Sequence, residues 1–229
     1  EVLDIPPFVL PPPTAVAGAI VQYWHAIWYE SLFTLGTTLA GFLLAVVFGL
    51  GLGLFIGWSR TIYAGLYPLM IGFNAIPKVA VVPILVLWFG IGAVPAVITA
   101  FLISFFPIVV NVATGLATIE PELEDVLKAL GASKLDIMRK VGIPRALPYF
   151  FGSLKVAITL AIIGAVVAEF VAAEEGLGYF IQFSTSFFKI PQAFAGLFFL
   201  AVVSLLLFKS VQWIQQWFFP WSLPRKSGH

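Results

Sequence analysis

Four polar or ionisable side chains lie within long apolar stretches of the sequence, where such groups are rare. Asn74, Lys78, Asn111 and Glu169 have mainly aliphatic and aromatic neighbours. Polar groups inside a membrane usually face a partner or a water-filled path, so these four are candidates for a translocation pathway. A structural role stays open for two of them. Lys78 can extend its ammonium group to the membrane surface, and Glu169 can cap a broken backbone or pair with a neighbour.

The residue inventory argues against most kinds of catalysis. An intramembrane enzyme needs paired catalytic groups, and Lys78, Lys155 and Glu169 form no Ser–His or twin-Asp arrangement. Cysteine is absent and the only histidines are His25 and His229, so we expect neither a disulfide nor a metal site. The sequence has no Gly-x-x-x-x-Gly-Lys-Ser/Thr phosphate loop, so the chain does not bind ATP by that means. We predict no cofactor.

The composition is that of a membrane protein. Of the 229 residues, 61% are hydrophobic and only 10% are charged, whereas a soluble domain has about 25% charged residues. The net charge is +1, without a concentrated basic face outside the central loop, which argues against a nucleic-acid partner. We therefore predict an all-α, multi-pass bundle of helices in a lipid bilayer.

Five apolar segments are long enough to cross the hydrocarbon core, which takes about 20 apolar residues. They are predicted at residues 32–56, 63–89, 96–116, 148–172 and 192–218. Pro68, Pro77 and Pro83 interrupt the second span, so we do not expect a smooth helix there.

Three glycines in the first predicted span lie on one helix face. Gly49, Gly53 and Gly57 are four residues apart. Small residues at this spacing let a second helix approach closely. The alternative is a lipid-facing helix in which the glycines have no packing role.

The segments outside the spans are short. Residues 1–30 are predicted to be extracytoplasmic, with an extended proline-rich start and an interfacial helix from Ala15 to Tyr29 whose Trp and Tyr residues suit the headgroup level. The alternative is that this helix forms the first turns of a longer span. Glu174–Gly178 is expected to interrupt the helix. Residues 173–191 are therefore predicted to form a broken extracytoplasmic segment. Residues 219–229 are predicted to be a cytosolic tail.

The distribution of lysine and arginine predicts the orientation. With five spans, Arg60, the central loop (residues 118–148) and the C-terminal end share one side, whereas the other side has only Lys189. The positive-inside rule puts the central loop in the cytosol. The N-terminal segment is then outside, and because the first residue is Glu1 we expect one further span upstream.

The central loop, the most charged part of the chain, is predicted to begin with a short helix. Pro121 suits the first turn of a helix, where its missing N–H has no consequence. Gly131 is expected to end the helix in a left-handed conformation. Apolar residues between them recur at i, i+3, i+4 and i+7: Leu123, Val126, Leu127 and Leu130.

A second short helix should follow directly. Ser133 and Asp136 have the spacing of a capping box, and Pro144 is expected to end the helix. The loop is therefore predicted to be an amphipathic helix, a sharp turn and another helix. Two interpretations remain open from the residues alone: the helices pack on their own membrane domain, or they bind a soluble partner.

The central loop resembles the "EAA" loop of binding-protein-dependent ABC importer permeases, E-A-A-x-x-x-G-x9-I-x-L-P. Here it reads Asp125-Val126-Leu127, Gly131 four residues after Leu127, and then Val141-Gly142-Ile143-Pro144 after nine more. The glycine, the spacing and the proline match the pattern. The departures at Asp125, Val126, Leu127, Val141 and Ile143 preserve charge or apolar character.

Further blocks resemble the nitrate/sulfonate/taurine-type branch of these permeases. They are Phe8–Pro13, Ile76–Gly92, Leu130–Ser133 and Ala168–Tyr179. The resemblance implies a type I ABC importer permease fold with five visible spans, a sixth at the N-terminus, and cytosolic coupling helices. It also implies ATPase-docking residues in the central loop: Glu124, Asp125, Val126, Leu127, Leu130, Gly131, Ala132, Ser133, Val141 and Pro144.

The partners and the solute follow from the resemblance only. It implies a cytosolic ABC ATPase dimer, a second, identical permease subunit, an extracytoplasmic solute-binding protein, and a bacterial inner membrane. The expected solute is small and anionic, such as a sulfonate, nitrate, bicarbonate or an aromatic carboxylate; a neutral pyrimidine- or vitamin-like solute is the alternative. An ATPase-independent, ion-coupled carrier would be expected to have acids in several spans, and only Glu169 is of this kind.

Overall fold

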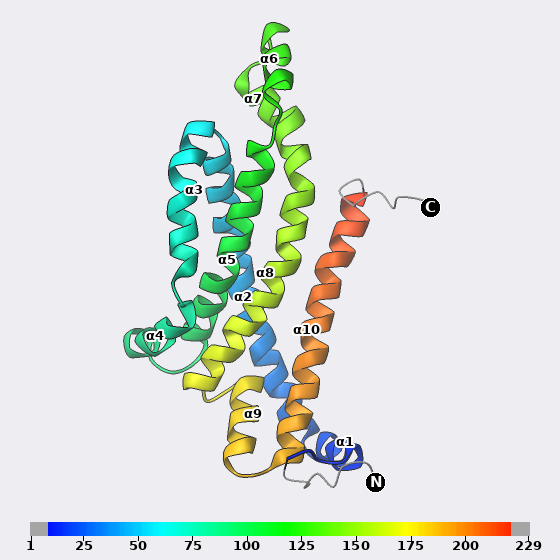
Figure 1. Ribbon diagram of the computed structural model, residues 1–229. Helices are drawn as coiled ribbons and strands as arrows, with labels where there is room; N and C mark the ends of the chain where they lie inside the picture. Colours follow the sequence, from blue (N-terminus) through cyan, green and yellow to red (C-terminus); the bar gives the residue numbers. More distant parts are fainter. Residues whose placement is uncertain (1–8, 221–229) are drawn as a thin grey trace. The chain divides into compact units, whose positions relative to one another are not determined.

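The computed structural model describes residues 9–220, and its regular structure in that range is helical (Figure 1). The predicted all-α fold is therefore confirmed. The elements are α1 (Pro13–Gln22), α2 (Trp24–Gly57), α3 (Arg60–Ala75), η1 (Lys78–Val81), α4 (Val82–Phe89), α5 (Ala93–Ala117), α6 (Pro121–Ala129), α7 (Lys134–Ile137), η2 (Met138–Gly142), α8 (Ile143–Ala172), α9 (Leu177–Ser186) and α10 (Ile190–Phe218).

Four stretches of helix in the described part of the chain are long and apolar enough to cross a membrane. They are Trp24–Gly57, Ala93–Ala117, Lys134–Ala172 and Ile190–Trp217. The pair made of α3 and η1–α4 counts as a fifth candidate span only when its two pieces are taken together. The break at Ile76–Pro77 agrees with the prediction that this segment is not a smooth helix.

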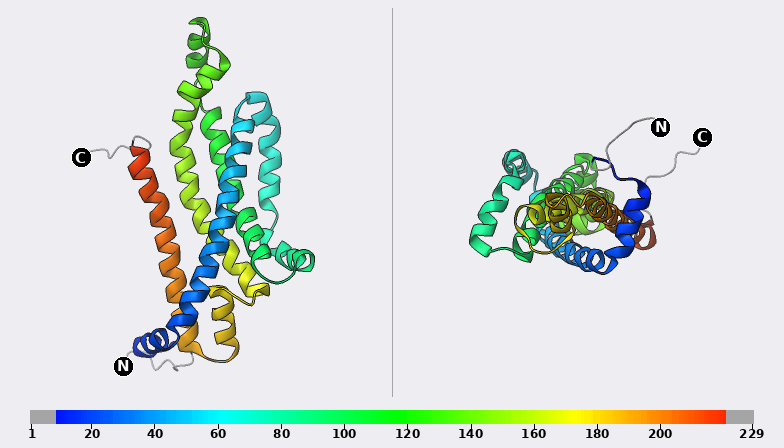
Figure 2. Two further views of the ribbon diagram at one scale, coloured as in Figure 1. Left: turned by 180° about the vertical axis from the view of Figure 1, so that it is seen from behind. Right: turned by 90° about the horizontal axis from the view of Figure 1, so that it is seen from below.

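The chain divides into two compact units. The first comprises Glu1–Gly41, Lys78–Leu102 and Leu160–Leu207. Its main core contains Ala19 of α1 and Ile27 of α2, together with Leu177 of α9 and Ala195 of α10. Figure 2 shows α9 beside the first turns of α10, with α1 close to the same end of that helix. The broken segment is thus packed among helices from both ends of the chain.

The second unit comprises Phe42–Pro77, Ile103–Thr159 and Phe208–His229. Its core joins the end of α2 to α5, with buried Ile56 against Val109 and Ala113, and α3 covers this cluster. The predicted glycine face lies at the same junction. A Cβ added at Gly53 would be 2.7 Å from the Cβ of Val112, so the two helices touch where the glycines leave room.

The expected interfacial helix from Ala15 to Tyr29 is divided in two. Tyr23 leaves the helical conformation (φ −108°, ψ 18°), and residues from Trp24 onward belong to the long helix α2. The backbone hydrogen bonds nevertheless continue through this bend, because Tyr23 N–H donates to the Ala19 carbonyl and Ile27 N–H donates to the Tyr23 carbonyl. The alternative, that part of this segment forms the first turns of a span, therefore holds for its second half.

The prediction that Pro144 ends a helix is wrong. The chain continues from α7 through η2 into α8. In η2, Ile143 N–H donates to the carbonyl of Met138, five residues back. This wider turn makes room for the proline ring, which would clash with a carbonyl four residues back in an α-helix. The span expected to begin at Pro148 therefore starts earlier.

One other boundary differs slightly from the prediction, and two predicted segments are only partly described. Helix α5 begins at Ala93, directly after the left-handed Gly90 and Gly92, rather than at residue 96. Residues 1–8 of the expected proline-rich start, and residues 221–229 of the expected tail, lie outside the described residues.

Candidate functional site

The predicted helix–turn–helix of the central loop is present. Helices α6 and α7 lie beyond the ends of α5 and α8, as both side views show (Figures 1 and 2). We call residues 121–137 the hairpin. Acidic Glu122 and Glu124 lie in the first turn of α6 and Lys128 lies in its last turn, so the charges complement the helix dipole.

The turn of the hairpin, residues 130–133, is held by backbone N–H groups that donate to local acceptors. Gly131 has φ +85°, its N–H donates to the Lys128 carbonyl, and Ala132 N–H donates to the Leu127 carbonyl. These are the two bonds of a Schellman motif. Ser133 and Asp136 then form the predicted capping box at the start of α7. The turn is therefore fixed by local hydrogen bonds on both sides of Gly131.

The apolar side chains of α6 form two pairs that differ in exposure. Leu123 and Leu127 are partly buried. Val126 and Leu130 are 56% and 79% exposed. Because the two pairs are each four residues apart, each forms its own ridge along the helix. One ridge is partly buried on this chain and the other is exposed, so packing on the membrane domain and binding of a partner both stay predictions.

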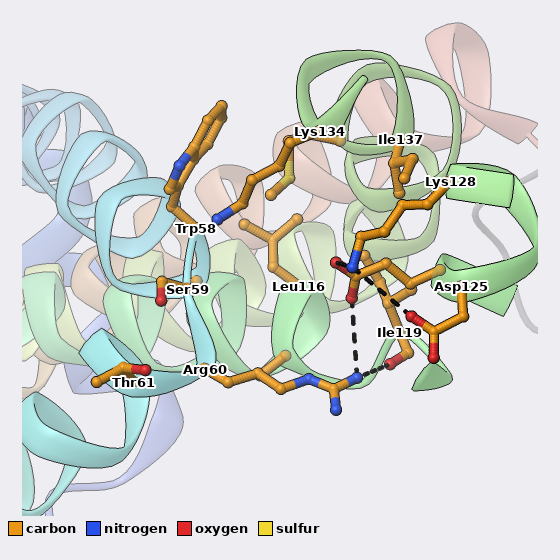
Figure 3. A pocket seen from close by; sticks show the side chains of 14 residues that line it. Trp58, Ser59, Arg60, Thr61, Leu116, Ile119, Asp125, Lys128, Lys134 and Ile137 are labelled. Carbon is orange, nitrogen blue, oxygen red and sulfur yellow. Dashed lines mark hydrogen bonds and ion pairs between the residues drawn. The ribbon is translucent and has the colours of Figure 1, made fainter. Parts of the chain in front are cut away.

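A pocket of about 330 Å³ lies between the hairpin and the turn that joins α2 to α3 (Figure 3). The Arg60 guanidinium donates to the Ile119 carbonyl at 3.2 Å and lies 3.9 Å from a Glu124 carboxylate oxygen. Lys128 pairs with the same carboxylate at 2.9 Å. On the opposite wall the Lys134 ammonium lies 5.4 Å from the ring centroid of Trp58. The pocket is lined by charges that are largely compensated within it.

Glu124 is the carboxylate that interacts with the positive charges in this pocket. The hydrogen bond from Lys128 lowers the pKa of the Glu124 carboxyl below its ordinary value, against a smaller opposing effect of burial. The charges of Lys128, Arg60 and Lys134 lower it further. Glu124 is therefore ionised at neutral pH, and its side chain, only 27% exposed, is engaged within the chain.

The remaining predicted docking residues fall on the outer surface of the hairpin and on its junction with α8. Asp125 is exposed, with a carboxylate oxygen 3.7 Å from Lys128. Ser133 and Pro144 are also exposed. A second groove of about 380 Å³ is lined by several of the others: Leu127, Leu130, Gly131, Ala132 and Val141.

The four candidate pathway residues are not gathered in one unit. Asn74 and Asn111 belong to the second unit, whereas Lys78 and Glu169 belong to the first. The Asn111 side-chain amide donates to the Pro107 carbonyl of its own helix at 2.8 Å. A translocation role for any of them stays a prediction.

Glu169 is completely buried and participates in a cap for helix α9. Gly178 N–H and the Thr34 hydroxyl both donate to one of its carboxylate oxygens at 2.9 Å. The same Thr34 oxygen accepts the N–H of Leu177 at 2.8 Å, and Gly176 N–H donates to Glu30. Three successive N–H groups at the start of α9 are thus satisfied by side chains from α2 and α8.

Sequence reasoning proposed the capping role of Glu169 as an alternative and missed Glu30 and Thr34 as its partners. The spacing of these two residues in the sequence is the signal that could have identified them. Glu30 and Thr34 are four residues apart, which places both on one face of helix α2. A Cβ at Gly176 would lie 2.4 Å from the Glu169 carboxyl carbon, so the glycine lets the carboxylate approach.

The helical spans and the hairpin have a counterpart among known families. A family model described as "Binding-protein-dependent transport system inner membrane component" matches residues 45–222. The chain belongs to this family. It is therefore a permease, an inner-membrane component of a binding-protein-dependent ABC importer, and not itself an enzyme. Membership implies a partner ATPase and a solute-binding protein.

Similar proteins match the permease over most of its length. The formylaminopyrimidine transport permease protein ThiX of Halalkalibacterium halodurans is 33% identical, over 94% of this chain and 86% of the relative. The riboflavin transport system permease protein RibX of Chloroflexus aurantiacus is 37% identical, over 89% and 76%. The taurine transport system permease protein TauC of Escherichia coli is 28% identical, over 95% and 82%.

A solved structure supports the fold. A chain of the MetNI methionine ABC transporter, in an inward-facing conformation, matches the permease with a TM-score of 0.66 and 20% identity. The match covers 89% of the permease and 99% of the other chain. The predicted fold of an ABC importer permease is thereby confirmed.

Proposed function

We propose that the permease docks on its ATPase in the cytosol through the exposed ridge of the hairpin formed by Val126 and Leu130, here called the outer ridge. The observation that supports this is the exposure of Val126 and Leu130 at the end of a hairpin whose turn is fixed by its own hydrogen bonds. Exposed apolar side chains on a rigid, charged element are typical of a protein interface. The charges around them favour orientation, and the apolar ridge supplies the contact area.

Val126 and Leu130 are the anchors in this proposal, and the predicted docking residues Asp125, Ser133 and Val141 surround them. Glu124 has a different role in it. Its carboxylate is already paired with Lys128 and Arg60, so it shapes the docking surface from within the chain. Gly131 and Ala132 keep the turn sharp enough for the ridge to enter a groove.

Co-purification tests the docking role. Leu130→Asp places an unpaired carboxylate at the centre of the proposed contact, and we expect it to lower the amount of ATPase that co-purifies with the permease by about tenfold or more. Ser186→Asp is the control, because it adds the same charge at an exposed position of α9, away from the hairpin. Equal ATPase recovery with Leu130→Asp and the unaltered permease would contradict docking through this ridge.

For the solute we propose a small nitrogen heterocycle of the pyrimidine or flavin kind, rather than the anion expected first. Two relatives named for such solutes share 33% and 37% identity with the permease, against 28% for the one named for taurine. The proposal rests on this ordering. Sulfonates such as taurine and small anions such as bicarbonate are the second candidate class.

Uptake by the complete importer decides between the two solute classes. Cells that express the permease with its ATPase and binding protein are given labelled riboflavin, formylaminopyrimidine, taurine or bicarbonate. We expect ATP-dependent accumulation of one of the first two. Accumulation of taurine or bicarbonate alone would contradict a heterocyclic solute and favour the sulfonate and small-anion class.

We propose further that two copies of the permease form the membrane part of the importer with an ATPase dimer. The sequence shows no internal repeat, and a second copy would supply the other half of the pathway. Closed two-fold symmetry is the commonest arrangement of identical subunits.

A further inference from the structure

The turn between α2 and α3 contacts both arms of the hairpin. Arg60, the first residue of α3, donates to the Ile119 carbonyl just before α6 and lies 3.9 Å from Glu124 within α6. Trp58, two residues earlier, lies under the Lys134 ammonium at the start of α7. Figure 3 shows these side chains on opposite walls of one pocket.

Helix α3 is held to the rest of its unit by a separate contact. The Tyr63 hydroxyl and the Thr114 hydroxyl of α5 are 3.2 Å apart. Leu66 and Met70, one and two turns further along α3, pack on the buried cluster of Ile56, Val109 and Ala113. The hairpin therefore contacts α3 through the turn at Arg60, apart from the contacts that α3 makes with α5.

We propose that Arg60 is a positioning residue that locks the hairpin to the start of α3, so that a displacement of the hairpin by the ATPase also moves α3. The site of this action is the pocket lined by Arg60, Glu124, Lys128, Lys134 and Trp58. The inference rests on the proposed docking of the ATPase on the hairpin. It adds a second route by which that docking reaches the membrane helices.

The ion pairs of Arg60 and Lys128 suit the transmission of movement better than the stabilisation of the fold, because both side chains are exposed. The Arg60 and Lys128 side chains are 57% and 51% exposed. Ion pairs of this exposure contribute little to stability and weaken with salt. Loss of these contacts should therefore leave the fold intact, so an effect of Arg60 on the position of the hairpin can be measured apart from unfolding.

Arg60→Gln removes the charge and keeps a side-chain donor, and Arg60→Lys restores the charge. Arg139→Gln is the matched control, because Arg139 is an exposed arginine that follows the hairpin and does not line this pocket. The natural chain contains no cysteine, so spin labels can be placed at Ala64→Cys in α3 and Ala129→Cys in α6 without background. Both positions are exposed.

The first measurement uses the full-length permease alone in lipid nanodiscs. We expect one narrow distribution of label distances for the unaltered permease and for Arg139→Gln, a clearly broader one for Arg60→Gln, and an intermediate width for Arg60→Lys. Unchanged thermal unfolding of Arg60→Gln would separate a positioning role from a loss of fold. The same width in Arg60→Gln and Arg139→Gln would overturn the proposal.

The second measurement uses the complex with the ATPase and the binding protein. We expect Arg60→Gln to retain ATPase co-purification and to lower the stimulation of ATP hydrolysis by the loaded binding protein roughly three- to tenfold. Stimulation equal to that of Arg139→Gln would overturn the proposal. Failure of the unaltered permease to bind an ATPase at all would instead overturn the proposed docking, and the distance distributions of the permease alone would stand apart from that result.

Discussion

Gly131 is the residue on which the shape of the hairpin depends. It alone of the turn residues has a positive φ, and an added Cβ would meet nothing within 4 Å. Its requirement is therefore conformational and not steric. Residues other than glycine occupy this region with difficulty, and asparagine tolerates it better than a β-branched residue.

A pair of substitutions at Gly131 separates conformation from bulk. Gly131→Val should strain the turn by about 1–2 kcal/mol, displace α7 relative to α6 and uncouple ATP hydrolysis from transport. Gly131→Asn should retain most of the coupling, because asparagine enters the left-handed region more readily. The measurement is the ratio of solute transported to ATP hydrolysed in proteoliposomes. An unchanged ratio and ATPase affinity in Gly131→Val would contradict a role for this turn in coupling.

For single residues, the sequence predicted the structure best where the interaction is local. The left-handed Gly131 and the capping box of Ser133 and Asp136 were both predicted correctly, because each depends on residues only a few positions apart. The pairing of Glu124 with Arg60 was not predicted, since the two are separated by 63 intervening residues. The same limitation hid Thr34 as a partner of Glu169.

At the level of helices, the close approach of α2 to α5 depends on the glycine face. Cβ atoms added at Gly49 and Gly57 would lie 2.9 Å and 2.7 Å from the Cβ atoms of Ile108 and Leu116. Gly51, on another face of the same helix, has nothing within 4 Å. The spacing of the glycines predicted the contact, although the sequence did not identify which helix makes it.

Alanine substitutions at two glycines of α2 test this packing. Gly53→Ala should lower the free energy of unfolding by about 1–3 kcal/mol, because its methyl group would overlap Val112 and the Val109 carbonyl. Gly51→Ala should leave stability unchanged or raise it by up to about 1 kcal/mol through helix propensity. Thermal unfolding of the two variants in the same lipid gives the comparison. Equal unfolding temperatures would show that α5 does not need the glycine at this point.

The start of α9 is held by side chains of other helices rather than by its own cap. Thr34 has a double role there, because its oxygen donates to Glu169 and accepts from Leu177. Buried groups left without such partners destabilise the surrounding structure. The broken segment should therefore lose its order before the long helices do when this network is disturbed.

Thr34→Val tests the network with little change of volume. We expect amide hydrogen exchange of residues 177–186 to become roughly tenfold faster, since the lost bonds correspond to about 1–3 kcal/mol of local stability. Thr99→Val is the control, because the buried Thr99 hydroxyl donates to the Pro95 carbonyl of its own helix. Similar acceleration in both variants would indicate a general effect of removing a buried hydroxyl.

For the whole molecule, the predicted orientation rests on charge. The central loop, which contains the hairpin, is the most charged part of the chain, and the segment around Glu174 and Glu175 is acidic. Membrane crossings were predicted well by apolar length, because that property does not depend on the fold. Their ends were predicted less well: local backbone geometry at Tyr23 and in η2 changed where α2 and α8 begin.

Labelling of single cysteines tests the orientation. Ala129→Cys in the hairpin should react with a membrane-impermeant maleimide only after the cells are opened, whereas Glu174→Cys should react in intact cells. Both side chains are exposed, and the sequence supplies no competing thiol. Reaction of Ala129→Cys in intact cells would place the hairpin outside and contradict ATPase docking.

The turn η2 has one more consequence for how the hairpin is aimed. Its hydrogen bond spans five residues where an α-helix spans four, so the segment contains one residue more than a regular helix of that path. Each residue advances an α-helix by about 100°. An extra residue in a regular helix would turn everything beyond it by that angle. The wide turn takes up this residue over the same path, so α7 and the outer ridge keep the direction that they would have on a regular helix one residue shorter.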